Sequence, residues 1–165
     1  MGDIYSNKNS PESPVDAASD AEEWLVTFPA LFSSLDEVRD FSGHAAERCG
    51  LDSAAVYAVQ LAVDEAFTNI VEHAFGGECL EEVECVCRIT PDALTVILKD
   101  CGVPFDPRNI PEPDLSTDLQ ERKVGGLGLY FMRQLMDEVE FTFHTEAGGQ
   151  IGCNVLRMVK RKEKK

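Results

Sequence analysis

Apolar residues recur at helical spacing along residues 53–75, which is the clearest pattern in the chain. A repeat near 3.6 residues predicts an amphipathic helix. Asp52 or Ser53 supplies its N-cap and Gly76–Gly77 its end. The residues expected on its buried face are Val59, Val63, Ala66, Phe67, Ile70 and Ala74.

Shorter patterns predict the other elements. Ser33 and Ser34 are typical N-cap residues for a helix over 35–49 that ends at Gly50, and a third helix is expected over 127–137. The expected strands cover residues 24–28, 83–90, 94–99, 139–145 and 151–159. This order of elements indicates an α+β two-layer sandwich, in which helices cover one face of a mixed, mainly antiparallel sheet.

The length of 165 residues fits one domain. Residues 1–21 are rich in Ser, Asn, Pro and Asp and are expected to form a disordered tail. Residues 22–160 then form the domain, and residues 161–165 a basic tail. Residues 100–126 lack periodicity, and a loop of this length inside a compact domain is usually functional.

The charge and the apolar content of the chain limit which partners and which cellular compartment we expect for it. The formal net charge of −15 opposes binding to nucleic acid. No apolar stretch approaches the roughly 20 residues that span a bilayer, and the N-terminal residues lack the apolar core of a signal peptide. We therefore expect a cytoplasmic protein without a membrane partner.

The six cysteines show no CxxC spacing and no His at a ligand spacing. Cys85 and Cys87 alternate in a strand-like run, so both thiols point to the same face. We therefore expect all six to be free, mostly buried thiols rather than a disulfide framework or a metal site.

Three local features could carry chemistry. Glu65 and Asn69 are four residues apart on the helix face that the core does not need. Asp100 is followed two residues later by Gly102, which lets a flat ligand approach the backbone. Residues 125–128 are rich in glycine and open a helix, where free N–H groups suit a phosphate. Taken singly, these features are also typical of a solvated helix face, an ordinary turn and a helix start.

The order and spacing of the three features carry a resemblance. The segments QLAVDEAFTN, DCGVPFDP and ERKVGGLGLYFMRQL follow one another along the chain. The sequence resembles the GHKL (Bergerat-fold) ATPases, and is most similar to the stand-alone anti-sigma-factor serine kinases of bacterial partner-switching systems. The resemblance covers roughly residues 23–160.

The resemblance implies roles for individual residues. Glu65 matches the general base, and Asn69 the asparagine that binds Mg²⁺. Asp100 matches the aspartate that hydrogen-bonds the adenine amino group of ATP, and Gly102 the glycine beneath the ring. Residues 107–124 match the lid that closes over the nucleotide.

The second glycine box is also matched. Gly126, Leu127 and Gly128 are expected to hold the phosphates through backbone N–H groups, with Lys123 as a candidate for charge neutralisation. His73 is a weaker candidate for a phosphate contact, because a structural, hydrogen-bonded histidine is the commoner arrangement. The late-strand threonine of the family is missing, since its nearest candidates are Gln150 and Cys153.

The resemblance implies an ATP-dependent serine/threonine protein kinase that uses Mg²⁺ and acts as an anti-sigma factor. Its expected partners are a STAS-type anti-anti-sigma factor, which accepts the phosphate, and a sigma factor, and a homodimer is favoured. The alternative is a nucleotide-gated binding module without turnover. Sensor histidine kinases and gyrase-type ATPases are disfavoured, because they need a dimerisation helix pair or a second domain.

Overall fold

The computed structural model describes residues 20–116, 127–145, 148 and 152–164. The elements in these residues follow the predicted order, with short 3-10 and π-helical segments added. They are β1 (Glu22–Pro29), the 3-10 turn η1 (Phe32–Ser34), α1 (Leu35–Cys49), α2 (Ser53–Asn69), the π-helix η2 (Ile70–Ala74), β2 (Glu82–Ile89), β3 (Ala93–Asp100), the 3-10 turn η3 (Pro107–Asn109), α3 (Leu127–Leu135), β4 (Glu138–Thr145) and β5 (Gly152–Arg161).

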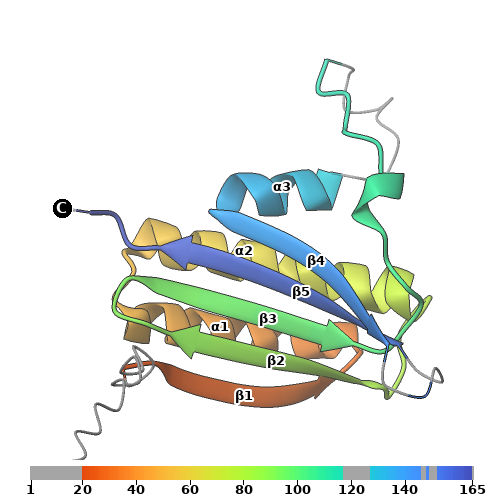
Figure 1. Cartoon of the computed structure of the whole chain (residues 1–165), viewed down its shortest axis with the longest axis horizontal. Coiled ribbons are helices and arrows are strands. Elements are labelled where there is room, and N and C mark those ends of the chain that lie inside the picture. The colour runs from red at the N-terminus through yellow and green to blue at the C-terminus, as the bar shows by residue number, and fades with distance from the viewer. Residues whose placement is uncertain (1–19, 117–126, 146–147, 149–151, 165) are drawn as a thin grey trace, which may run out of the picture.

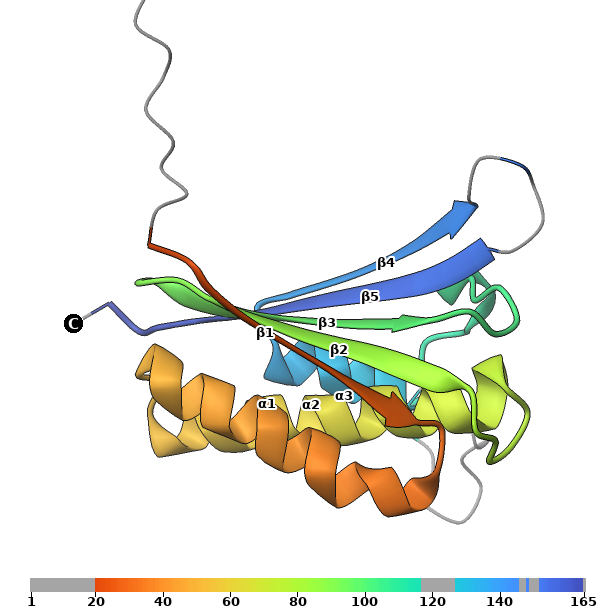
Figure 2. The same ribbon diagram turned by 90° about the horizontal axis from the view of Figure 1, so that it is seen from below.

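The strands form one sheet in the order β1-β2-β3-β5-β4. The helices α1, α2 and α3 all lie against the same face of this sheet, so the predicted two-layer α+β architecture is confirmed (Figure 1, Figure 2). The predicted mixed sheet is wrong for the described strands, because every neighbouring pair is antiparallel. The strands β3 and β4 run in the same direction, but β5 lies between them and pairs antiparallel with both.

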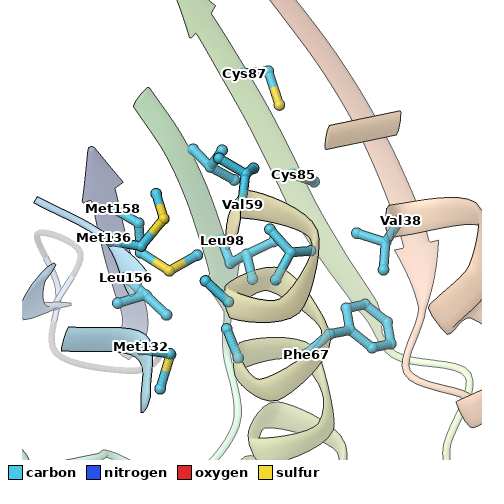
Figure 3. Close-up of a cluster of buried hydrophobic side chains, with 14 of the residues drawn as sticks. Val38, Val59, Phe67, Cys85, Cys87, Leu98, Met132, Met136, Leu156 and Met158 are labelled. Carbon is cyan, nitrogen blue, oxygen red and sulfur yellow. The ribbon is translucent and has the colours of Figure 1, made fainter. Parts of the chain in front are cut away.

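The core fills the space between the sheet and the three helices. The predicted apolar face of α2 and η2 is confirmed, since each of its members is at most 7% exposed. Figure 3 shows Val59 and Phe67 from α2 in the same cluster as Leu98 of β3. Met132 of α3 and Met158 of β5 belong to this cluster too. The apolar face of α2 therefore fixes which side of that helix faces away from the core.

The ends of the first two helices test the cap predictions. Gly50 adopts φ 85° after α1, and the Asp52 carboxylate accepts a hydrogen bond from the Ala55 N–H at 2.8 Å, so both predictions are confirmed. The predicted serine cap of α1 is wrong. Ser34 already has a helical backbone at the end of η1, and its hydroxyl donates instead to the carbonyl of Pro29 at 2.9 Å.

The helix α2 does not stop at Asn69 but continues as the π-helix η2. The turn that follows uses Gly76 and Gly77 at φ 71° and 140°, a backbone region that favours glycine. Single π-helical turns such as η2 are frequent at functional sites. Here η2 places the carbonyl of Ala74 against the loop that follows β3, where it accepts a hydrogen bond from the Val103 N–H at 2.8 Å.

Candidate functional site

A pocket lies among the C-terminal part of α2, η2, α3 and the sheet. Its wall is mostly apolar, and its polar side chains are those of Asn69, His73, Asp100 and Asn154. Ligand pockets commonly combine an apolar wall with a few polar groups that fix orientation. The residues lining it are Ala66, Asn69, Ile70, His73, Ala74, Asp100, Val103, Pro104, Phe105, Met132, Phe141, Asn154 and Leu156.

Asp100 is the buried carboxylate of this pocket, with 4% of its surface exposed. Its Oδ1 accepts hydrogen bonds from the Gly102 N–H at 3.0 Å and from the Asn154 amide at 2.9 Å. Burial raises the pKa of the Asp100 carboxyl above its ordinary value, while these two hydrogen bonds act in the opposite direction. Its Oδ2 accepts no hydrogen bond from the described residues and remains an acceptor for a ligand.

Gly102 packs directly onto the end of η2. A Cβ atom at this position would lie 2.4 Å from the carbonyl oxygen of Ala74 and 2.7 Å from its carbonyl carbon. Both are backbone atoms, so the clash could not be relieved by a side-chain rotation. A residue without a side chain is therefore required where the loop after Asp100 meets the pocket.

Asn154 organises this loop, although it is not among the site residues predicted from the sequence. Its amide donates to Asp100 Oδ1 and to the carbonyl of Val103, both at 2.9 Å, and its Oδ1 accepts from the Phe105 N–H at 2.8 Å. The available signal was a polar residue at a helix-facing position of β5, where Leu156 and Met158 are buried. The two candidates for the late-strand threonine were Gln150 and Cys153. Gln150 lies outside the described residues, and Cys153 is the residue before Asn154 in β5.

Glu65 and Asn69 meet the start of α3 beside the pocket. A Cβ atom on Gly128 would lie 2.8 Å from Glu65 Oε2 and 3.4 Å from Asn69 Nδ2. The bare glycine therefore lets both side chains approach the backbone of α3. Asn69 also lines the pocket that contains Asp100, so the first two sequence features converge on one site with the described part of the third.

His73 and Leu127 are the remaining predicted site residues in the described part of the chain. His73 lines the pocket and is exposed, and its Nε2 lies 3.9 Å from a carboxylate oxygen of Glu72. It is thus a surface group at the pocket and not part of the core. Leu127 is the first residue of α3 and is half-buried. Gly126 and Lys123 lie outside the described residues.

The cysteines correct one prediction. Cys101 and Cys153 form a disulfide, so these two are not free thiols. They are 52 residues apart in sequence, and only the antiparallel register that pairs Asp100 with Asn154 brings them together. Cys85 and Cys87 are free and buried as predicted, as is Cys49, whereas the free Cys79 is half-buried.

Residues 28–160 match the family model of the histidine kinase-like ATPase domain. The chain belongs to this family. It is 36% identical over 102 residues to the serine-protein kinase RsbW of Listeria monocytogenes, an alignment that covers 59% of this chain and 65% of that protein. It is 33% identical over 123 residues to the serine-protein kinase RsbW of Bacillus cereus, covering 72% of this chain and 76% of that protein. The chain thus spans slightly less than two thirds of the Listeria relative.

Two classes of feature are missing from the described part of this ATPase domain. None of the helices in the described residues has the length and apolar character of a membrane-spanning segment. The same residues contain no group of three or more His, Cys, Asp and Glu side chains placed to hold a metal ion.

Mg²⁺ can bind without such a cluster, because it takes one or two protein oxygens together with phosphate oxygens and water. The amide oxygen of Asn69 is a donor of the required kind. It lies beside Glu65 where Gly128 leaves space next to the backbone of α3. The donor set at this end of the pocket fits Mg²⁺ that arrives with a nucleotide.

Proposed function

We propose that this chain is an ATP-dependent serine/threonine protein kinase that phosphorylates a small partner protein. The observation that carries the proposal is the approach of Glu65 and Asn69 to Gly128, beside the pocket that holds Asp100. A module that only bound nucleotide would need a base-binding pocket and a metal ligand, but no carboxylate beside them. Membership in the ATPase family and relatives named as serine-protein kinases support the same reaction.

In this proposal the pocket binds the adenine ring. The Oδ2 of Asp100 accepts a hydrogen bond from the adenine amino group, and the ring lies against the apolar wall near Gly102. Asn154 holds both Asp100 and the following loop in place, so the acceptor is oriented before the nucleotide arrives.

The phosphates extend from the pocket toward α3. In this proposal the backbone N–H groups of Gly126 and Gly128 bind the phosphates. Asn69 would hold the Mg²⁺ that accompanies the nucleotide, and the ion would neutralise part of the phosphate charge. Glu65 takes the proton of the attacking serine or threonine hydroxyl. As the new oxygen–phosphorus bond forms, the bond from the γ-phosphorus to the bridging oxygen breaks and ADP leaves.

The net charge of −15 makes these local groups necessary, because ATP is itself a polyanion. An acidic chain attracts ATP only through local groups, which in this proposal are the metal, the helix N-terminus and cations next to the glycine box in the sequence, such as Lys123. The charge therefore predicts a strong dependence of binding on Mg²⁺.

The partners follow from the family resemblance. We propose that the phosphate acceptor is a STAS-type anti-anti-sigma factor, that the kinase also sequesters a sigma factor, and that it acts as a homodimer. Phosphorylation of the acceptor would then prevent it from displacing the kinase from the sigma factor.

Phosphotransfer with ATP labelled on the γ-phosphate tests the kinase proposal. The purified chain, Mg²⁺ and a candidate STAS-type partner should give label on a serine or threonine of that partner, and chelation of Mg²⁺ should abolish the label. Binding of ATP without transfer to a partner that forms a complex with the chain would support the nucleotide-gated module instead.

Asn69→Ala is expected to weaken Mg-ATP binding by about tenfold to a hundredfold, because one oxygen ligand of the metal is removed and a charge-assisted contact is lost. Isothermal titration calorimetry with ATP measures this, with and without Mg²⁺. Gln134→Ala is the control, since it removes an exposed carboxamide from α3 and should leave the affinity unchanged. An unchanged affinity in Asn69→Ala would refute the metal role.

A further inference from the structure

The disulfide joins the ends of two strands immediately beside the pocket. Cys101 follows Asp100 at the end of β3, and Cys153 precedes Asn154 at the start of β5. The pair Asp100–Asn154 is the last register pair between these strands, so the bridge lies one step beyond it. Figure 1 shows this end of β3 beside the start of β5. Because side chains alternate along a strand, the bridge and the Asp100–Asn154 contact lie on opposite faces of the sheet.

The residues next to the bridge hold the loop that walls the pocket. Asn154 is hydrogen-bonded to Asp100, Val103 and the backbone N–H of Phe105. These contacts and the bridge connect the same two chain segments. The disulfide therefore lies next to the loop that forms part of the pocket wall.

The two bridged cysteines differ in exposure. Cys101 is exposed, whereas Cys153 is buried with 6% of its surface exposed. Exposed bridges are the ones that small thiols reduce most readily. The free thiols Cys85 and Cys87 lie in β2, which β3 separates from β5. Exchange is therefore expected to enter through Cys101, and β3 separates the bridge from the two free thiols of β2.

We propose that Cys101 and Cys153 form a redox switch that sets the affinity of the pocket for nucleotide, with the bridged form binding more tightly. The bridge removes motion of the loop relative to β5 before the ligand binds, so less ordering has to accompany binding. This inference rests on the proposed nucleotide site. Reduction leaves the loop held by hydrogen bonds alone, namely those of Asn154, that of the Gly102 N–H to Asp100 and that of the Val103 N–H to the carbonyl of Ala74.

The oxidant is a small-molecule disulfide such as oxidised glutathione. The Cys101 thiolate attacks it, one glutathione thiolate leaves, and a mixed disulfide forms at Cys101. The Cys153 thiolate then attacks the Cys101 sulfur and releases the second glutathione. Two electrons pass from the protein to glutathione disulfide, and the two protein thiol protons end on two glutathione thiols. A dithiol reductant reverses both steps.

The test compares wild type oxidised with glutathione disulfide and wild type reduced with dithiothreitol, each after removal of the reagent. Thiol titration in denaturant should count four thiols in the oxidised chain and six in the reduced chain, as the bridge and the four free cysteines require. Calorimetry with Mg-ATP should then give a Kd roughly three- to tenfold lower for the oxidised chain. Cys101→Ser should bind like the reduced wild type in both conditions, and Cys79→Ser should respond like wild type.

The outcomes separate this inference from the proposed function. Equal affinities in the two forms, or six thiols after oxidation, would overturn the switch while leaving ATP binding intact. Absence of ATP binding in both forms would overturn the proposed nucleotide site and the switch with it. A response that persists in Cys101→Ser would also overturn the proposal, because the variant cannot form the bridge.

Discussion

Glu65→Gln is expected to lower the rate of phosphotransfer by roughly two to four orders of magnitude while leaving ATP affinity near that of wild type. Glutamine keeps the size and one oxygen of the side chain, so it can still fit beside Gly128. The space there is tight, since a Cβ atom added to Gly128 would lie 2.8 Å from Glu65 Oε2. It cannot take a proton from the attacking hydroxyl. Rapid-quench kinetics with labelled ATP under single-turnover conditions measure the chemical step, and calorimetry measures binding.

Glu47→Gln is the matched control, because it makes the same substitution at an exposed carboxylate of α1 and should leave both quantities unchanged. A loss of rate together with a large loss of affinity in Glu65→Gln would indicate a binding role in place of general-base catalysis. If Glu65→Gln transferred phosphate as fast as wild type, Glu65 would not be the base.

Much of the fold could be predicted because it depends on local patterns. The apolar repeat of α2 fixed its buried face, and that face left Glu65 and Asn69 pointing away from the core. The helix caps at Gly50 and Asp52 could also be predicted, since each depends on one residue and its nearest neighbours. The Asp100–Gly102 turn belongs to the same class, because its hydrogen bond spans only two residues.

What the sequence did not reveal depends on register between distant strands. The disulfide and the contacts of Asn154 with Asp100 join residues more than 50 positions apart, and no local pattern states which residues of β3 and β5 stand opposite one another. The fully antiparallel pairing could not be predicted for a similar reason. It depends on the position of β5 between β3 and β4, and no local pattern states the order of strands in the sheet. The serine cap failed for a different reason: η1 precedes α1 and already gives Ser34 a helical backbone.

Asp100→Asn is expected to reverse the preference of the pocket between ATP and inosine triphosphate. The Oδ1 of Asp100 accepts both internal hydrogen bonds, and an asparagine oxygen can accept the same two. The new NH₂ group then replaces Oδ2, which accepts no hydrogen bond from the described residues. An acceptor facing the adenine amino group thus becomes a donor, which suits the carbonyl of hypoxanthine. The ratio of ATP to inosine triphosphate affinity should fall from roughly 100 or more to below one.

Competition calorimetry with the two nucleotides measures this ratio, and Asp40→Asn, at an exposed aspartate of α1, should keep the ratio of wild type. A preference for ATP that survives in Asp100→Asn would show that this carboxylate does not read the base.

The pH dependence of wild type gives a second check on Asp100, and its sign can be worked out from burial. Burial raises the pKa of the folded carboxyl above 3.8, so the folded state holds the proton more tightly than the unfolded state does. At this residue, lowering the pH through the raised pKa therefore favours folding. The same protonation converts the charged acceptor into a neutral acid and should weaken ATP binding. Calorimetry should show that wild type loses ATP affinity in this pH range while circular dichroism shows that the chain stays folded. Asp100→Asn should not show this loss. That result would assign the titration to the Asp100 contact and not to acid unfolding.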